Sequence, residues 1–228
     1  GGTLLYHQYS PERIEKKAEE ILSKYLEGEL MHSPQPMDVD HFAEFYLNAT
    51  IDFANLSQDF KTLGCTCFND GILMVWNDER TEEYPIQVKA GYIFIDNKVL
   101  DSDIEGRVRF TIIHECSHLI LHPRFYYKRP GEENPKINCT VYQIESWGRQ
   151  TPMTDDEIRE WQANRLGAAL IMPARAVKML MAKKLDLSVE ETSSLNVSDV
   201  FIQEMADFFV VSKSAMKNRL RDLNLISI

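Results

Sequence analysis

The order of apolar and polar residues predicts a helix near the start of the chain. After Ser10-Pro11, a pair that favours a helix start, apolar residues recur every three or four positions, at Ile14, Ala18, Ile21, Leu22 and Tyr25. This spacing places them on one face of a helix, which we expect to run from Pro11 and to end near Gly28. Two prolines then disfavour helix over residues 31–37, which we interpret as a linker.

The pattern changes to short apolar or aromatic segments in the middle of the chain. Segments 50–53, 71–76 and 91–95 lie between turn residues and predict strands, and a short helix is expected before them, over residues 38–47. Cys65 and Cys67 lie in a similar apolar stretch and are expected to be strand residues. These segments predict a small sheet within one α+β domain.

Two longer helices are expected after the sheet. Ser102 and Glu105 have the spacing of a capping box, and Pro123 follows the last apolar residues, so we expect a helix of about 18 residues between them. Thr154 and Glu157 repeat this signature, and the second helix should run to about residue 171, just before a proline.

Composition and charge narrow the class of protein. With 228 residues, 44% of them hydrophobic, the chain is long enough to bury a full core. No apolar run approaches the roughly 18 residues that cross a bilayer, and the first residues do not resemble a secretory signal. We therefore expect a soluble cytoplasmic protein, away from membranes, with its four cysteines reduced. A net charge of −10 repels a phosphate backbone, so nucleic acid is not an expected partner.

The first long helix carries the motif His114-Glu115-Cys116-Ser117-His118. Its two histidines lie one turn apart on the same face, so both imidazoles can reach one ion. Zn²⁺ suits this pair, because a catalytic zinc takes three protein ligands and leaves a fourth position for water. Glu115 is turned about 100° from His114 on the helix, which suits a general base better than a ligand. The third ligand must come from elsewhere in the chain.

The motif H-E-x-x-H also occurs by chance, so its context decides the interpretation. It is followed by Glu160-Trp161-Gln162-Ala163-Asn164 and then by a run of small residues that leads into segment 170–173. Together these segments closely resemble the ImmA/IrrE family of metallopeptidases, a branch of the zincins. Segments 36–39 and 109–113 also agree with that family, and the resemblance covers the chain from about residue 36 to about residue 180.

The resemblance implies the remaining site residues. Glu160 corresponds to the third ligand of a single Zn²⁺ ion, beside His114 and His118, and Glu115 corresponds to the catalytic glutamate. The alternative is that Glu160 is an ordinary charge on an exposed helix face. Two histidines and a carboxylate would also suit Fe(II). Asn164 follows Glu160 by one turn, where an amide can orient a ligating histidine.

The resemblance also implies an architecture and a function. We expect an N-terminal helix and linker at 1–35, a zincin-like metallopeptidase domain at 36–184, and a C-terminal helical, helix-turn-helix-like segment at 185–228. The implied activity is zinc-dependent cleavage of a protein or peptide, by family resemblance a transcriptional regulator in a stress or mobile-element response. The chain departs from the family in the length of segment 125–152, which either shapes the cleft or is a passive loop.

Several contacts to a substrate stay open at this point. A donor to the oxyanion can come from Tyr126, Tyr127, Tyr142 or His122, although packing or capping suits His122 better than ligation. An extended substrate can pair with a sheet edge, for which we consider segment 90–95.

The C-terminal segment leaves a competing function open. A helix through residue 209, a short turn and a helix capped by Ser212 predict a helix-turn-helix-like pair. We expect four exposed positive charges on it, at Lys213, Lys217, Arg219 and Arg221. These are few for operator binding, so packing or partner docking is the favoured role. The alternatives to a peptidase are a DNA-binding regulator with structural zinc and an inactive zinc fold that binds a partner.

Overall fold

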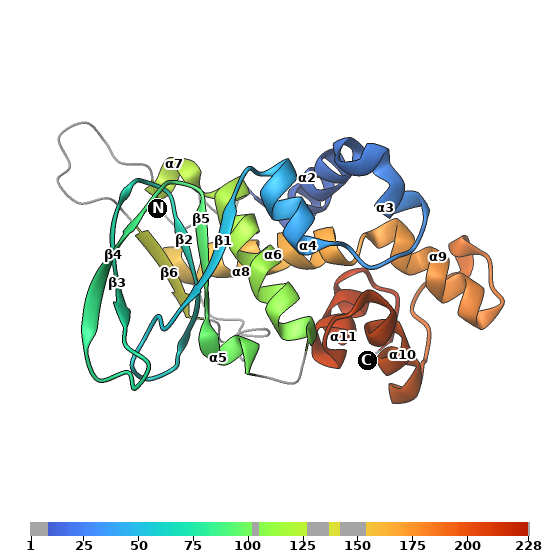
Figure 1. Ribbon diagram of the computed structural model, residues 1–228. Helices are drawn as coiled ribbons and strands as arrows, with labels where there is room; N and C mark the ends of the chain where they lie inside the picture. Colours follow the sequence, from blue (N-terminus) through green and yellow to red (C-terminus); the bar gives the residue numbers. More distant parts are fainter. Residues whose placement is uncertain (1–8, 102–104, 127–136, 142–153, 228) are drawn as a thin grey trace.

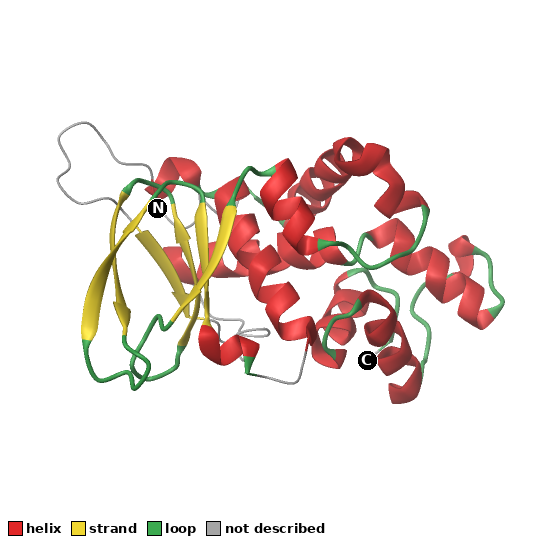
Figure 2. Cartoon of the chain, viewed as in Figure 1, coloured by secondary structure: helices red, strands yellow, loops and turns green. Residues whose placement is uncertain are grey.

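The computed structural model describes residues 9–101, 105–126, 137–141 and 154–227. It is an α+β protein in which two small sheets lie at one end and most of the helices at the other (Figures 1 and 2). Within the described residues, no helix has both the length and the apolar character needed to cross a bilayer.

The main sheet has the strand order β1-β5-β2-β6. Strand β1 (Thr50–Ala54) pairs in parallel with β5 (Tyr92–Asp96), while β2 (Thr62–Cys67) pairs antiparallel with both β5 and β6 (Ile137–Val141). The strands β3 (Gly71–Trp76) and β4 (Glu83–Val88) form a separate hairpin. The strands predicted at 50–53, 71–76 and 91–95 are confirmed, and Cys65 and Cys67 lie in β2 as expected.

Strands β2 and β5 of the main sheet are buried on both faces, since successive residues of a strand point to opposite sides and nearly all of theirs are buried. Ile93 and Ile95 of β5 belong to the large core cluster that the helices form. Phe94, between them, packs in a second cluster with residues such as Leu73 and Val75 of the hairpin. The sheet is therefore a layer between the helices and the β3–β4 hairpin.

The expectation that segment 90–95 forms a free sheet edge is wrong. Strand β5 lies inside the sheet, paired on one side with β1 and on the other with β2, so its backbone is not available to a substrate. The edges of this sheet are β1 and β6. Apolar pattern locates a strand but does not give its neighbours, since a strand that is buried on both faces can lie at the edge or in the centre.

The two long predicted helices are confirmed and lie side by side. Helix α6 (Glu105–Leu121) ends before Pro123, which begins the short helix α7 (Pro123–Tyr126). Its expected cap, Ser102, lies outside the described residues. Helix α8 (Asp155–Ile171) begins with the predicted capping box, in which Thr154 and Glu157 exchange side-chain and backbone hydrogen bonds.

The N-terminal helix is shorter than expected. Helix α2 (Pro11–Lys24) is capped by Ser10 and buries the predicted apolar face against α8. It gives way to the turn η1 (Tyr25–Gly28), because Leu26 and Glu27 have left-handed backbone angles, with φ of 50° and 56°. The short helices α3 (Glu29–His32), α4 (Val39–His41) and η2 (Phe42–Tyr46) follow, and the last two cover the helix predicted at 38–47.

The C-terminal helices pack into the same core as the rest of the chain. Helix α9 (Ala174–Leu185), the turn η4 (Val189–Glu191), α10 (Asp199–Phe209) and α11 (Lys213–Asp222) follow one another. The side chains of Phe209 and Leu220 are fully buried in the large cluster. Arg109 of α6 donates hydrogen bonds to the carbonyls of Phe209 and Val210, at the end of α10.

One of the four charges expected to be exposed on this segment is buried. The Arg219 side chain is 1% exposed, and its Nε–H donates to the Met172 carbonyl at 2.9 Å. Its guanidinium also pairs with Glu15 of α2. A charged side chain is tolerated inside the protein when its donors find acceptors, as Nε, Nη1 and Nη2 of Arg219 do here.

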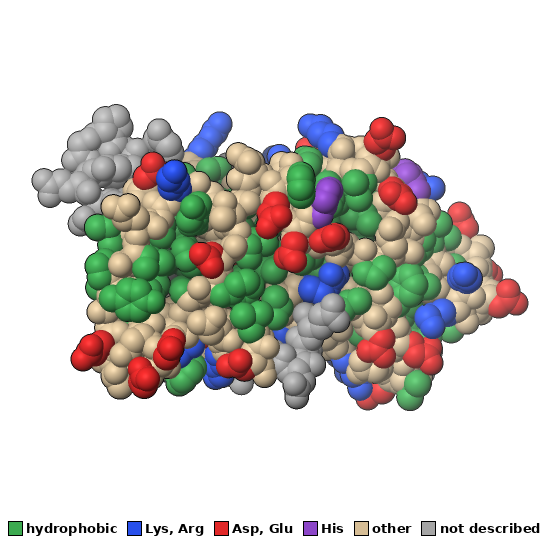
Figure 3. Space-filling view, in the orientation of Figure 1, with side chains coloured by type: hydrophobic (Ala, Val, Ile, Leu, Met, Phe, Trp, Pro, Cys, Tyr) green, Lys and Arg blue, Asp and Glu red, His purple; other side chains and the backbone are tan. Residues whose placement is uncertain are grey.

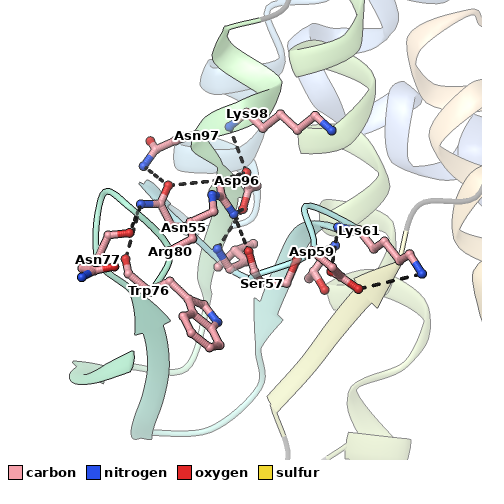
Figure 4. Close-up of polar contacts among 12 residues, drawn as sticks. Asn55, Ser57, Asp59, Lys61, Trp76, Asn77, Arg80, Asp96, Asn97 and Lys98 are labelled. Carbon is pink, nitrogen blue, oxygen red and sulfur yellow. Dashed lines mark hydrogen bonds and ion pairs between the residues drawn. The ribbon is translucent and has the colours of Figure 1, made fainter. Parts of the chain in front are cut away.

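A buried polar network joins the hairpin to the main sheet (Figure 4). Arg80, in the turn between β3 and β4, makes two hydrogen bonds to the carboxylate of Asp96, at 2.6 and 3.0 Å. Arg80 also donates to Asn55, and Asp96 accepts from the backbone of Lys98 at the start of α5 (Asn97–Leu100). The Arg80 and Asp96 side chains are 6% and 0% exposed, so the pair is shielded from water.

Candidate metal centre

Helices α6 and α8 approach closely enough to bring their polar side chains together. At Gly167 of α8, an added Cβ would lie 3.4 Å from Ile113 and 3.5 Å from the backbone nitrogen of His114. The two helices are therefore in van der Waals contact at this point, with room for a small side chain between them. This close packing places Glu160 opposite the histidine face of α6.

The side chains of His114, His118 and Glu160 converge on one point. The two Nε2 atoms lie 3.2 Å apart, and they lie 3.1 and 3.2 Å from the two carboxylate oxygens of Glu160. With zinc–ligand bonds of about 2.0 to 2.1 Å, the ligand atoms of a tetrahedral site are separated by about 3.3 Å. The three side chains thus have the chemistry and the spacing of a zinc site. Among the described residues, no other cluster of three or more His, Cys, Asp or Glu side chains is arranged to hold a metal ion.

The site is buried on the histidine side and open on the glutamate side. His114 and His118 are 1% and 0% exposed, whereas the Glu160 side chain is 29% exposed. Burial raises the pKa of Glu160, but the adjacent imidazoles outweigh it and hold this pKa well below its usual range. Glu160 is therefore an anion at neutral pH, and a ligand or water can reach the cluster from its side.

Each imidazole of the cluster also has a polar contact at its other nitrogen. Asn164 lies one turn after Glu160, and its Oδ1 is 2.8 Å from Nδ1 of His114. For His118, the corresponding Nδ1 lies 3.0 Å from Nδ1 of His122, whose Nε2 is 2.9 Å from Oε1 of Gln162. His122 is thus buried against His118 and is not one of the three converging side chains, which agrees with the expectation of packing rather than ligation.

Glu115 is fully buried against strand β2. The hydroxyl of Thr66 donates a hydrogen bond to its carboxylate. Gly64, two residues earlier on the same side of the strand, leaves room for this carboxylate, since an added Cβ would lie 2.9 Å from both Cγ and Cδ of Glu115. Strand β2 therefore fixes the position of the side chain that the motif suggests as general base.

Among the candidate oxyanion donors, Tyr126 lies within the described residues and contacts α8. Its hydroxyl accepts a hydrogen bond from Nε–H of Arg159, the residue before Glu160, at 2.9 Å. Its ring stacks on Phe68, just after β2, and its carbonyl accepts from Asn69. Burial raises the pKa of the Tyr126 phenol, so the hydroxyl keeps its proton. Tyr127 and Tyr142 lie outside the described residues.

The residues that support the cluster were missed by the sequence patterns. Gly64 and Thr66 come from a strand some fifty positions before the motif, and nothing in their spacing pairs them with Glu115. Gln162 lies inside the segment that resembles the family, yet helical spacing alone does not show that it faces His122. A glycine in the interior of a predicted strand was the available signal, because such glycines often mark close approach of another group.

Comparison with known proteins places the chain in a family. Among curated proteins, no sequence matches it. A family model for peptidase M78, described as the IrrE N-terminal-like domain, matches residues 77–221 of the 228. The matched segment takes in both helices of the metal centre and the C-terminal pair α10 and α11. Because the match covers more than half of the chain, this protein belongs to the M78 peptidase family, the IrrE N-terminal-like group of metallopeptidases.

Proposed function

We propose that this chain is a zinc-dependent endopeptidase. The observation that carries the proposal is the spacing of His114, His118 and Glu160, whose ligand atoms lie 3.1 to 3.2 Å apart, beside a buried glutamate. Membership in a peptidase family supports hydrolysis of a peptide bond as the reaction.

The side chains divide the chemistry between them. When bound, a zinc ion would supply Lewis acidity toward a water molecule and toward the carbonyl oxygen of the scissile bond. His114, His118 and Glu160 would hold it, with two neutral imidazoles and one carboxylate as donors. Glu115 accepts a proton from the attacking water and returns it to the leaving nitrogen, so the products are a carboxylic acid and an amine.

We propose Tyr126 as a second donor to the developing oxyanion. Because its oxygen already accepts the hydrogen bond from Arg159, its own O–H is free to donate elsewhere. Arg159 is itself fixed, by a hydrogen bond to Asp156 and by the ring of Phe125, which lies 3.5 Å from its guanidinium carbon. A phenol held in this way needs little reorganisation when negative charge forms on the substrate.

The substrate that we propose is a transcriptional regulator, cleaved in a stress or mobile-element response in the cytoplasm. Support for this class comes from the family to which the chain belongs, whereas the site itself supports peptide hydrolysis in general. Cys65, Cys67 and Cys116 are not joined in disulfides, which suits a reducing compartment.

A DNA-binding role receives less support from the C-terminal helices. Arg219 makes its contacts inside the protein, and Lys213 forms an ion pair with Asp199 at 3.1 Å. On the face drawn in Figure 3, acidic and basic side chains are mixed over the α10–α11 end of the molecule, unlike the continuous basic surface that binds a phosphate backbone.

The proposal is tested by metal content and cleavage measured on the same preparations. Wild type should contain about one zinc per chain, and Glu160→Ala should lose most of it, because one of three ligands is removed. Glu115→Gln should keep its zinc and lose cleavage of a candidate regulator, since the amide cannot accept the proton.

Two results would contradict the proposal in different ways. Full zinc occupancy in Glu160→Ala would show that the third ligand is another residue. Unchanged cleavage by Glu115→Gln would remove the glutamate from the mechanism. A binder without peptidase activity would retain its partner affinity in Glu115→Gln and show no cleavage in wild type.

A further inference from the structure

The contacts of His118 differ from those of His114 in one respect. An amide oxygen, that of Asn164, meets Nδ1 of His114 directly. A second imidazole, that of His122, meets Nδ1 of His118, and the amide of Gln162 lies behind it. All of these groups except Asn164 are at most 3% exposed, so water does not supply alternative partners for them.

His118, His122 and Gln162 form a row of side chains joined by hydrogen bonds. When Nε2 of His118 binds a cation, these hydrogen bonds can be donated in only one direction along the row. A ligating Nε2 carries no proton, so the neutral His118 ring must carry its proton on Nδ1 and donate it. The atom 3.0 Å away, Nδ1 of His122, must therefore accept. His122 then carries its own proton on Nε2 and donates it to Oε1 of Gln162, 2.9 Å away.

The orientation of the Gln162 amide agrees with this direction. Gln162 offers a carbonyl oxygen, which accepts and never donates, at the position where the proton of His122 must go. If the row ran the other way, Nε2 of His118 would be protonated and would face the Nε2 of His114 at 3.2 Å as a donor. Such a ring would be a hydrogen-bond donor and could not be a metal ligand.

We propose that His122 and Gln162 are positioning residues, which fix the ring orientation and the tautomer of His118 for metal binding. The inference rests on the proposed function, because it assumes that His118 is a ligand. It assigns a role to two residues of the helix pair outside the three-residue cluster. His122 is the residue directly after α6, four positions after His118, and α8 contributes Gln162 two residues after Glu160.

The test is zinc affinity, measured by competition with a chromophoric chelator on the full chain. His122→Phe keeps a ring of similar size but removes both nitrogens, and should raise the zinc dissociation constant by about 10- to 100-fold. His122→Asn retains an acceptor near the Nδ1 position and should bind zinc more tightly than His122→Phe. As a matched control, His41→Phe removes a histidine hydrogen bond to Tyr25, outside the cluster, and should leave zinc affinity unchanged.

A second variant separates the row from simple packing. Gln162→Leu keeps the volume but removes the terminal acceptor, so it should weaken zinc binding in the same direction. Because both residues act through one row, the double variant with His122→Phe should be no weaker than His122→Phe alone. In the zinc-loaded wild type, nitrogen NMR should show neutral His122 with its proton on Nε2.

The outcomes distinguish this inference from the proposed function. Equal zinc affinity in wild type, His122→Phe and Gln162→Leu would overturn the positioning role while leaving the zinc site intact. Additive losses in the double variant, or a His122 protonated on Nδ1, would also overturn it. A wild-type chain that takes up no zinc would remove both proposals together.

Discussion

Replacement of Gly64 by alanine should displace the proposed general base. The new Cβ would lie 2.9 Å from both Cγ and Cδ of Glu115, whereas carbon atoms in contact are separated by about 3.5 to 4.0 Å. Glu115 is fully buried and bonded to Thr66 on the same strand, so its carboxylate has to move by roughly half to one ångström. A misplacement of about 1 Å at a catalytic group lowers the rate by roughly 100-fold.

The assay is steady-state cleavage of a peptide or regulator, with zinc content and thermal unfolding measured beside it. We expect a fall in kcat of about 10- to 100-fold in Gly64→Ala at full zinc occupancy, because the ligands lie on α6 and α8 and not on β2. Gly167→Ala is the matched control. Its added Cβ would make ordinary contacts, at 3.4 Å or more, although it lies as close to the metal centre.

Two results would refute this reasoning. If Gly64→Ala cleaves as fast as wild type, the carboxylate position seen against β2 is not the one that acts in catalysis. If zinc is lost in Gly64→Ala and kept in Gly167→Ala, then β2 supports the ligands rather than the base.

Three further predictions concern other parts of the molecule. Arg80→Met leaves the buried Asp96 carboxylate without its partner and should lower the free energy of unfolding by about 3 to 5 kcal/mol in a denaturant titration, whereas Lys61→Met, at the exposed pair in Figure 4, should not change it. Thr154→Ala removes the cap of α8 and should cost about 1 kcal/mol, seen as a lower Tm; no change would mean that the capping box is not formed in solution. Tyr126→Phe should lower kcat by about 100-fold while zinc content stays the same, and an unchanged kcat would remove Tyr126 as the oxyanion donor.

Local patterns predicted the elements of this fold well, because helices and strands are governed by neighbouring residues. The capping box at Thr154 and Glu157 and the proline after α6 set helix ends that the structure confirms. The end of α2 was harder to predict. The left-handed angles of Leu26 and Glu27 end the helix before Gly28, and neither residue is a type that signals such angles.

Contacts between distant segments were beyond the reach of these patterns. The position of β5 in the sheet depends on pairing with β1 and β2, which lie far away in sequence. The burial of Arg219 depends on acceptors in α2 and just after α8, which are distant in sequence and give no signal at Arg219 itself. Two members of the metal cluster could be predicted from spacing, because His114 and His118 lie one helical turn apart. Glu160 was predicted from the family resemblance.

Strand β6 has a consequence for how the sequence of this chain is free to change. It belongs to the segment that is longer than the family resemblance predicts, and it covers the side of β2 that β5 leaves unpaired. Pairing uses the backbone of β6, which many sequences can provide, whereas Gly64 and Thr66 of β2 are constrained by Glu115. An extended peptide that approaches this edge meets residues 137–141 before it meets β2. The sequence of β6 can therefore change, and with it the selectivity for a peptide at this edge, while Gly64 and Thr66 of β2 are kept by their contacts with Glu115.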